Sequence, residues 1–406
     1  MTVPLSRNRN YTLLWSSEVL SEVGFNASMI AFPLLVLGIT GSAAASGLVL
    51  AADALAQLLA GLPAGALVDR WNRRTIMLGC EAAQAIALGT LVAALWYGRA
   101  GVLHLVAVAV VLGVSRALFE PAEDACLPTL VADEQLSTAI ALNSARSSIG
   151  QLSGTALGGL LFAIARWVPF AVDLLTHTAA FLGLLFLRVP RREVPRRPLR
   201  HLGREVADGL RWVWHRREVR VTAVCAVALN LFFSAFYLVI IVLAQRDGVP
   251  AGEIGIMAAM LGAGGIIGAL LAPYLLRVLT PYTSIAGVFW ALTLLTPLAV
   301  VVDGGYLLGL LFAGMALLAP TANTTINTHQ LLLAPDDLRG RLSGVMSVVT
   351  GTAAALGPAL GGLLVELVPA PSAVLVCAAG MAVVTLLVTV NPTLRNYPHN
   401  RKESLV

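Results

Sequence analysis

Long apolar runs recur along the whole chain, and they restrict its fold more than any other feature. Residues 373–390 form one such run, and residues 105–114 with their flanks form another. Each approaches the roughly 20 residues that a helix needs to cross about 30 Å of hydrocarbon. The charged fraction is only 12%, against about 25% in a typical soluble domain. The sequence therefore predicts an all-α membrane protein.

Twelve transmembrane helices are expected from the spacing of these runs. They are placed at 12–38, 47–68, 75–97, 103–125, 138–163, 169–188, 220–244, 253–276, 283–302, 306–331, 340–366 and 371–390. Arg7 and Arg9 precede a first apolar stretch that is too long for a signal-peptide core, so we expect it to remain as a span.

The distribution of basic residues predicts the topology. Of 27 Lys and Arg residues, Arg99, Arg166 and Arg246 would face outside if the N-terminus is cytoplasmic, and Arg116 and Arg146 lie within spans. The other 22 then fall on the cytoplasmic side, as the positive-inside rule requires. We therefore expect both termini in the cytoplasm, in a bacterial inner membrane. The net charge of +5 serves orientation and contact with anionic lipid, so nucleic acid is not an expected partner.

An internal repeat appears when the chain is compared with itself at an offset of 203 residues. Gly61 then meets Gly264, and the stretch 157–161 meets 360–364 with the same order of residues. One offset for both sites, equal to half of the 406 residues, indicates a duplicated six-helix unit. The predicted architecture is two pseudo-symmetric bundles with a substrate site near the midplane.

A basic segment joins the two predicted bundles, which are assigned to 1–188 and 220–406. Residues 189–219 contain prolines, many arginines, and apolar side chains at helical spacing. This pattern predicts an amphipathic linker at the cytoplasmic membrane surface, with a partner-binding role as the alternative.

The loop between the second and third spans carries the most specific motif. It contains Gly65, Asp69, Arg70, Asn72, Arg73 and Arg74. This loop resembles the G-x-x-x-D-x-x-G-R-R signature of the major facilitator superfamily, with Asn72 in place of the second glycine. We expect Gly65 to allow close helix approach and Asn72 to adopt a left-handed turn.

A second stretch narrows the resemblance. Residues 119–131 contain Glu120 and Asp124, and a Gly-rich fifth span follows with Gly154 and Gly158. This order is similar to the drug:proton antiporter branch, which includes macrolide-efflux proteins and siderophore exporters. The resemblance implies a cytoplasmic gate of Asp69, Arg73 and either Glu120 or Asp124. At the 203 offset, uncharged residues replace these acids in the second half.

Glycines in the fifth and eleventh spans are expected to pack helices closely. The set is Gly154, Gly158, Gly357, Pro358 and Gly361. The family's antiporter signature has a proline after its first glycine, which Pro358 supplies and Thr155 does not. Small residues four apart are also a general packing motif, so these glycines alone do not establish antiport.

Charges inside the spans are candidates for coupling, because one at a helix centre costs about 2.5–3.5 kcal/mol to insert. Glu18, Glu22 and Asn26 are spaced four apart and form one polar stripe. Further candidates for coupling and for the cavity wall are Arg116, Arg146, Asp53 and Asp173 in the first half, and Asn230, Asn323 and Asn327 in the second. We hypothesise that Glu22, with Glu18, exchanges protons and pairs with Arg116 or Arg146.

These features predict a secondary transporter that exports a small amphipathic molecule by alternating access, coupled to protons. An importer or a lipid flippase of the same fold remains open, since no residue determines direction. A membrane-embedded enzyme is disfavoured, because the sequence has no phosphate-binding loop and no metal-spaced His/Cys cluster. We expect no cofactor, a proton gradient as the energy source and a monomer. His104, His177 and His329 are interpreted as packed or cavity-lining residues.

Overall fold

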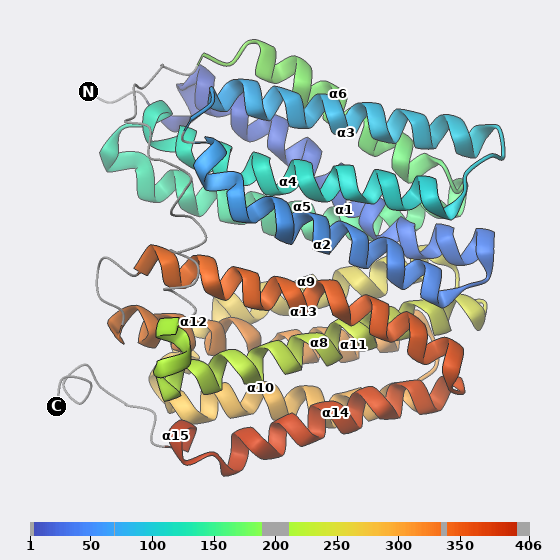
Figure 1. The fold of residues 1–406 in the computed structure, drawn as a ribbon, viewed down its shortest axis with the longest axis vertical. Coiled ribbons are helices and arrows are strands. Elements are labelled where there is room, and N and C mark those ends of the chain that lie inside the picture. Colours follow the sequence, from blue (N-terminus) through green and yellow to red (C-terminus); the bar gives the residue numbers. More distant parts are fainter. Residues whose placement is uncertain (1–3, 69, 189–210, 334–338, 396–406) are drawn as a thin grey trace. The chain divides into compact units, whose positions relative to one another are not determined.

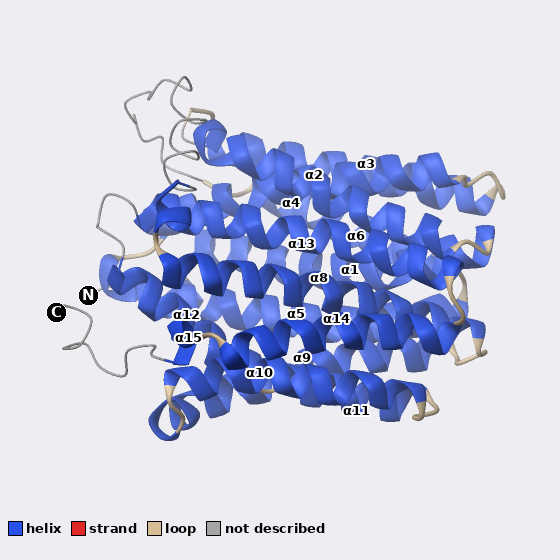
Figure 2. Ribbon diagram, turned by 60° about the horizontal axis from the view of Figure 1, so that its bottom comes forward, coloured by secondary structure: helices blue, strands red, loops and turns tan. Residues whose placement is uncertain are grey.

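The computed structural model describes residues 4–68, 70–188, 211–333 and 339–395, and almost all of them are helical (Figure 2). The first half contains η1 (Leu5–Arg7), α1 (Arg9–Thr40), α2 (Ala43–Val68), α3 (Arg73–Trp96), α4 (Val102–Leu130), η2 (Asp133–Gln135), α5 (Leu136–Ile164) and α6 (Val168–Leu185). The second contains α8 (Arg217–Arg246), α9 (Ala251–Val278), α10 (Pro281–Leu295), η4 (Thr296–Val300), α11 (Gly305–Ala316), α12 (Ala319–Leu333), α13 (Arg339–Leu367), α14 (Ala370–Val390) and α15 (Pro392–Arg395).

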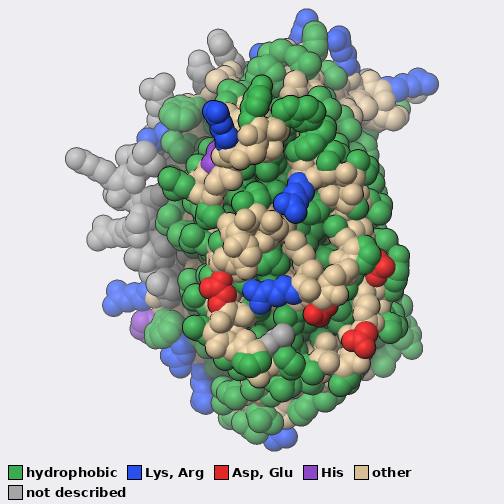
Figure 3. Space-filling view, turned by 90° about the vertical axis from the view of Figure 1, so that its right-hand side faces the viewer, with side chains coloured by type: hydrophobic (Ala, Val, Ile, Leu, Met, Phe, Trp, Pro, Cys, Tyr) green, Lys and Arg blue, Asp and Glu red, His purple; other side chains and the backbone are tan. Residues whose placement is uncertain are grey.

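Eleven helical segments of the described chain are long and apolar enough to cross a membrane, and a shorter apolar helix, Gly351–Leu367, lies at the expected eleventh span. Large apolar side chains are exposed along many of them, such as Leu103 at 83% and Leu270 at 77%. Apolar side chains exposed along the helices suit hydrocarbon rather than water, and the predicted all-α transmembrane fold is confirmed. Figure 3 faces the ends of the helices on the right-hand side of Figure 1, where charged side chains are exposed among apolar ones.

The tenth expected span consists of two helices. α11 ends at Ala316 and α12 begins at Ala319, with Leu317 and Leu318 in a turn between them. Pro320 follows at once, and a proline lacks the N–H that a continuous helix would use there. The chain therefore breaks near the middle of this span.

Local sequence explains the helix boundaries in the predicted gate loop. Asn72 has extended backbone angles, and its side chain accepts a hydrogen bond from the Arg74 N–H. It is thus the N-cap of α3, and the expected left-handed turn was wrong, because asparagine satisfies a free helix donor in this position. Asp69 and residues 189–210 of the predicted linker lie outside the described residues, while residues 211–215 are helical.

The chain divides into two compact units. The first comprises Met1–Gly41, Leu48–Leu199 and Pro250–Ala259, and the second comprises Ser42–Gly47, Arg200–Val249 and Met260–Val406. The helices of each unit pack in the same pattern of pairs, and their labels can be followed in Figure 1. In the first, α1 packs on α5 and α6, and α3 packs on α4 and α6. In the second, α8 packs on α13 and α14, and α10 packs on α12 and α14.

Glycines of α5 and α13 allow close contacts with α1 and α8. A Cβ on Gly158 would lie 2.5 Å from the Ala27 carbonyl oxygen of α1, and one on Gly154 would lie 2.5 Å from the Val23 oxygen. Gly357 and Gly361 press in the same way on Ser234 and Ala235 of α8. No described atom lies within 4 Å of a Cβ built on Gly65, and the close approach expected there stays a prediction.

We predict that Gly158→Ala destabilises the protein, while Gly79→Ala does not. Gly79 of α3 also sits inside a helix, but a Cβ there meets no described atom within 4 Å. Alanine favours a helix by about 0.5–1 kcal/mol, whereas overpacking costs about 1–3 kcal/mol. The unfolding temperatures of the detergent-purified variants should therefore move in opposite directions, and a rise in both would contradict the tight α1–α5 contact.

Candidate functional site

The polar stripe of α1 faces α4 in the first unit. Glu22 Oε1 lies 3.5 Å from Nη2 of Arg116, whose Nε donates to Glu120 Oε1 at 2.7 Å. Asn26 Nδ2 donates to the Glu22 carboxylate at 3.2 Å, and the Arg116 guanidinium lies 4.4 Å from the centre of the Phe25 ring. One arginine is therefore shared by two carboxylates, and of the two proposed partners of Glu22 the structure places Arg116 beside it.

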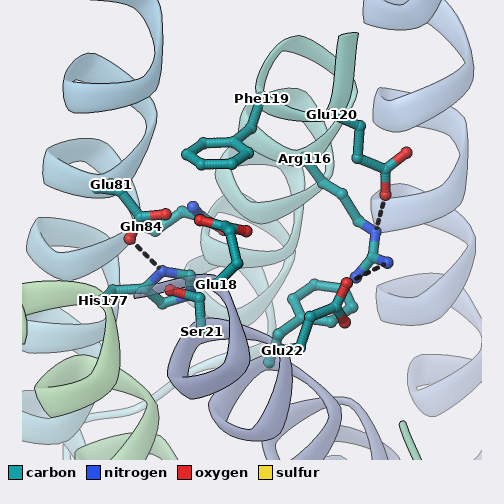
Figure 4. Close-up of a pocket in the computed structure, with 10 residues that line it drawn as sticks. Glu18, Ser21, Glu22, Glu81, Gln84, Arg116, Phe119, Glu120 and His177 are labelled. Atoms are coloured by element: carbon teal, nitrogen blue, oxygen red, sulfur yellow. Dashed lines mark hydrogen bonds and ion pairs between the residues drawn. The ribbon is translucent and has the colours of Figure 1, made fainter. Parts of the chain in front are cut away.

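A second ionic group lies on the other side of Glu18 (Figure 4). His177 of α6 is held between two buried carboxylates, with Nδ1 2.7 Å from Glu81 Oε2 and Nε2 3.2 Å from Asp173 Oδ1. Glu18 is itself buried, and its Oε1 has no hydrogen-bond partner among the described residues. A carboxyl group in this position either carries a proton or relies on water in the adjoining cavity.

A small cavity of about 40 Å³ connects the two groups. Its walls come from α1, α3, α4 and α6, and include Glu18, Glu22, Glu81, Arg116, Glu120 and His177. Figure 4 shows Arg116 with Glu22 and Glu120 on one side, and Glu81 with His177 on the other. A polar cavity needs about 10–15 Å³ to hold one water, so this one has room for water between the two groups. Protons could pass between them through that water.

A third pair joins α4 to α5. Arg146 donates to both oxygens of Glu123 at 2.5 and 3.0 Å, and Asn143 donates to the same carboxylate at 3.3 Å. Arg146 and Glu123 are 5% and 4% exposed. Arg146 therefore fixes α5 to α4. In the stretch that suggested Glu120 or Asp124 as the gate acid, the buried acid is Glu123, which lies between them, and Asp124 is exposed.

The arginines of the predicted gate bind backbone carbonyls of the first unit. Arg73 Nη1 donates to the Ala125 oxygen of α4 at 2.6 Å. Arg74 donates to the Leu184 and Leu185 oxygens at the end of α6, at 3.0 and 2.5 Å. A cation at a helix C-terminus is favourable because unpaired carbonyls and the helix dipole are both negative there. Arg70 is half-buried, and the proposed link to Asp69 remains a prediction.

The remaining candidates are dispersed. Asp53 lies half-buried on α2, where its backbone carbonyl approaches Gly113 of α4. Asn230 of α8 and Asn323 of α12 are exposed and belong to the second unit, and Asn230 donates to the Ala226 carbonyl at 2.8 Å. The side chain of Asn327 lies outside the described residues.

Sequence reasoning missed Glu81, Glu123 and the role of His177. Glu81 lies within the expected third span and Glu123 at the end of the fourth, so the cost of inserting a charge marks both as candidates. Asp173 and His177 are four residues apart on one helix face, a spacing that brings their side chains together.

Residues 2–404 match the family described as transmembrane secretion effector, a group of the major facilitator superfamily. The chain belongs to this family. It is 27% identical over 407 residues to the multidrug efflux pump Tap of Mycolicibacterium fortuitum, covering 94% of this chain and 96% of that one. It is 29% identical over 374 residues to Tap of Mycobacterium tuberculosis, covering 87% and 86%. Macrolide efflux protein A of Streptococcus pyogenes is 26% identical over 182 residues, 45% of each chain.

Solved structures agree on the fold. A point mutant of the nucleoside transporter NupG superimposes with a TM-score of 0.79 at 12% identity, covering 93% of this chain and 98% of that one. A bacterial homologue of the iron transporter ferroportin gives 0.72 at 18% identity, covering 95% and 99%. The protein is a multi-pass membrane transporter of small molecules and not an enzyme.

We predict that Arg146→Met lowers the stability of the transporter by about 3–5 kcal/mol, because it leaves the Glu123 carboxylate buried without its partner. Adding Glu123→Gln should recover most of the loss. The measurement is the temperature at which half of the detergent-solubilised protein aggregates, with Arg99→Met, at an exposed loop position, as the control. Equal losses in the single and double variants would show that the pair is not what holds α5 to α4.

Proposed function

We propose that this transporter exports a small amphipathic molecule from a bacterial cell in exchange for protons. It acts by alternating access in the inner membrane, as a monomer with both termini in the cytoplasm and without a cofactor. Its relatives are described as a multidrug efflux pump and a macrolide efflux protein, which supports export. Proton exchange rests on the ionic groups of the first unit.

The observation that carries the coupling is the sharing of Arg116 between two carboxylates. Glu22 is the more distant partner, at 3.5 Å against 2.7 Å for Glu120, and its side chain is 12% exposed while that of Glu120 is 54% exposed. A proton on Glu22 removes its attraction for Arg116, while the pair of Arg116 and Glu120 persists. The contact between α1 and α4 at this point then depends on whether Glu22 is protonated.

The energy available fits export against a gradient. One proton moving through 100 mV releases about 2.3 kcal/mol, and about 1.36 kcal/mol corresponds to each factor of ten. One proton that moves through 100 mV for each exported molecule therefore supports a substrate gradient of roughly fifty-fold. The cluster of Glu81, His177 and Asp173 lies across the same cavity and serves as a second place where protons are held, with Glu18 between the two groups.

We predict that Glu22→Gln abolishes substrate movement driven by a pH gradient and leaves substrate binding within about threefold, since glutamine keeps the size and shape of the side chain but cannot take up or release a proton. Transport is measured in inside-out vesicles with an imposed gradient, and binding is measured on the purified protein. Glu134→Gln, at an exposed position of η2, is the matched control.

Two outcomes would count against the proposal. Full pH-driven transport by Glu22→Gln would remove Glu22 from coupling and leave Glu18 as the acid to test. Loss of accumulation in inside-out vesicles together with uptake in right-side-out vesicles would reverse the direction and make the protein an importer.

A further inference from the structure

Two different residue offsets relate the helices of the two units. Some helices correspond at 203, and others correspond at 208. Gly154 and Gly158 of α5 correspond to Gly357 and Gly361 of α13 at 203. Their contacts on the opposing helix are Val23, Asn26 and Ala27 in the first unit and Leu231, Ser234 and Ala235 in the second. Each of these pairs is 208 apart, so α8 is displaced from α1 by five more residues than the repeat suggests.

Helix starts support the same assignment. α3 begins at Arg73 behind the cap Asn72, and α10 begins at Pro281 behind the cap Thr280, again 208 apart. α4 and α11 begin at Val102 and Gly305, which are 203 apart.

In this register the ionic cavity of the first unit has a counterpart in the second. Glu18, Ser21, Glu22 and Phe25 of α1 correspond to Ala226, Leu229, Asn230 and Phe233 of α8, and Arg116, Phe119 and Glu120 of α4 correspond to Ala319, Ala322 and Asn323 of α12. All seven second-unit residues line one cavity, just as all seven first-unit residues line the other. Glu81 and Gln84 of α3 likewise correspond to Phe289 and Leu292 of α10, and these too line the second cavity.

The substitutions change what the cavity can hold. The charged side chains that fill the first cavity are replaced by alanine, phenylalanine and asparagine, and the volume is about 280 Å³ instead of about 40 Å³. An engineered apolar cavity of about 150 Å³ binds benzene. The second cavity is nearly twice that size, whereas protein interiors contain few voids larger than a water molecule.

We propose that this cavity of the second unit binds the apolar ring portion of the transported molecule, with the amides of Asn230 and Asn323 bonding an uncharged polar substituent. No ionisable carboxylate, amine or guanidinium lines it among the described residues, so a fully charged group would lose its hydration without a partner. The ligand class is thus a neutral one- or two-ring aromatic or alicyclic moiety. The equivalent position holds charged side chains in the first unit and, in this proposal, the apolar part of the substrate in the second.

The short helix α15 contributes to the wall of this site. Leu394 of α15 lines the cavity and is 1% exposed. Thr222, near the start of α8, lines it too. The wall is therefore built entirely from helices of the second unit.

Cys225 provides a direct test, because it lines the cavity and is less buried than Cys80, Cys126 and Cys377. Membrane vesicles are treated with N-ethylmaleimide, and alkylation of each cysteine is followed by mass spectrometry. The neutral probe 1-naphthamide should slow alkylation of Cys225 only, and its anionic analogue 1-naphthoate should not. Equal rates with and without 1-naphthamide would overturn the proposal.

A cavity-filling variant makes the test specific. Ala319→Phe should weaken protection by 1-naphthamide by at least about tenfold, since one methylene in an apolar pocket is already worth about 10- to 200-fold. Leu310→Phe, which adds bulk at an exposed position of α11, should protect as the parent does. Protection that survives both Ala319→Phe and Ala322→Phe would place the probe elsewhere.

The inference rests on the proposed export but not on protons, and the assay separates the two. Glu22→Gln should keep full protection of Cys225 while losing pH-driven transport. If transport is proton-independent and protection persists, only the coupling proposal fails. If coupling holds and protection is absent, only the binding site fails.

Discussion

The cost of placing charge in a low-dielectric interior governs the first unit. Glu81, Glu123 and Arg146 are each less than 6% exposed, and each is paired with an ionisable side chain from another helix. Breaking such a pair is expensive, so the pairs fix which helices are neighbours. α3 is tied to α6 through His177, and α4 is tied to α5 through Arg146. Among the described residues, Glu18 lies buried between these groups with one oxygen unpaired, while Arg116 serves two acids. The places where proton binding changes an interaction are therefore few and adjacent.

The fold followed from the sequence almost completely, and the site followed in part. Apolar length sets where a helix must cross the bilayer, so the expected spans coincide with the helices within a few residues. The stripe of Glu18, Glu22 and Asn26 was also accessible, because helical spacing and insertion cost both point to it, while the partner of Glu22 was narrowed only to Arg116 or Arg146. Partners such as Glu81 and His177 were not, because their pairing depends on α3 and α6 lying side by side, which no local pattern encodes.

The duplication shows a similar limit. Glycine motifs on the fifth and eleventh spans reveal the repeat at 203, but connections of different length shift the first and third helices of the second unit by five residues. Comparison at 203 sets Glu22 against Cys225, which is a weak hydrogen-bonding group. The helix contacts set it against Asn230, an amide one methylene shorter. The second unit therefore has a polar but uncharged group at this position.

The break between α11 and α12 has a consequence for the proposed binding cavity. The cavity wall includes Met315 and Ala316 on one side of Leu317 and Leu318, and Ala319 and Ala322 on the other. This wall belongs to two short helices, and a change of angle at the turn alters the width of the cavity without breaking a hydrogen bond inside either helix. A single continuous helix would hold the width constant. The interruption gives the wall of the proposed binding cavity a physical means of fitting ligands of different width.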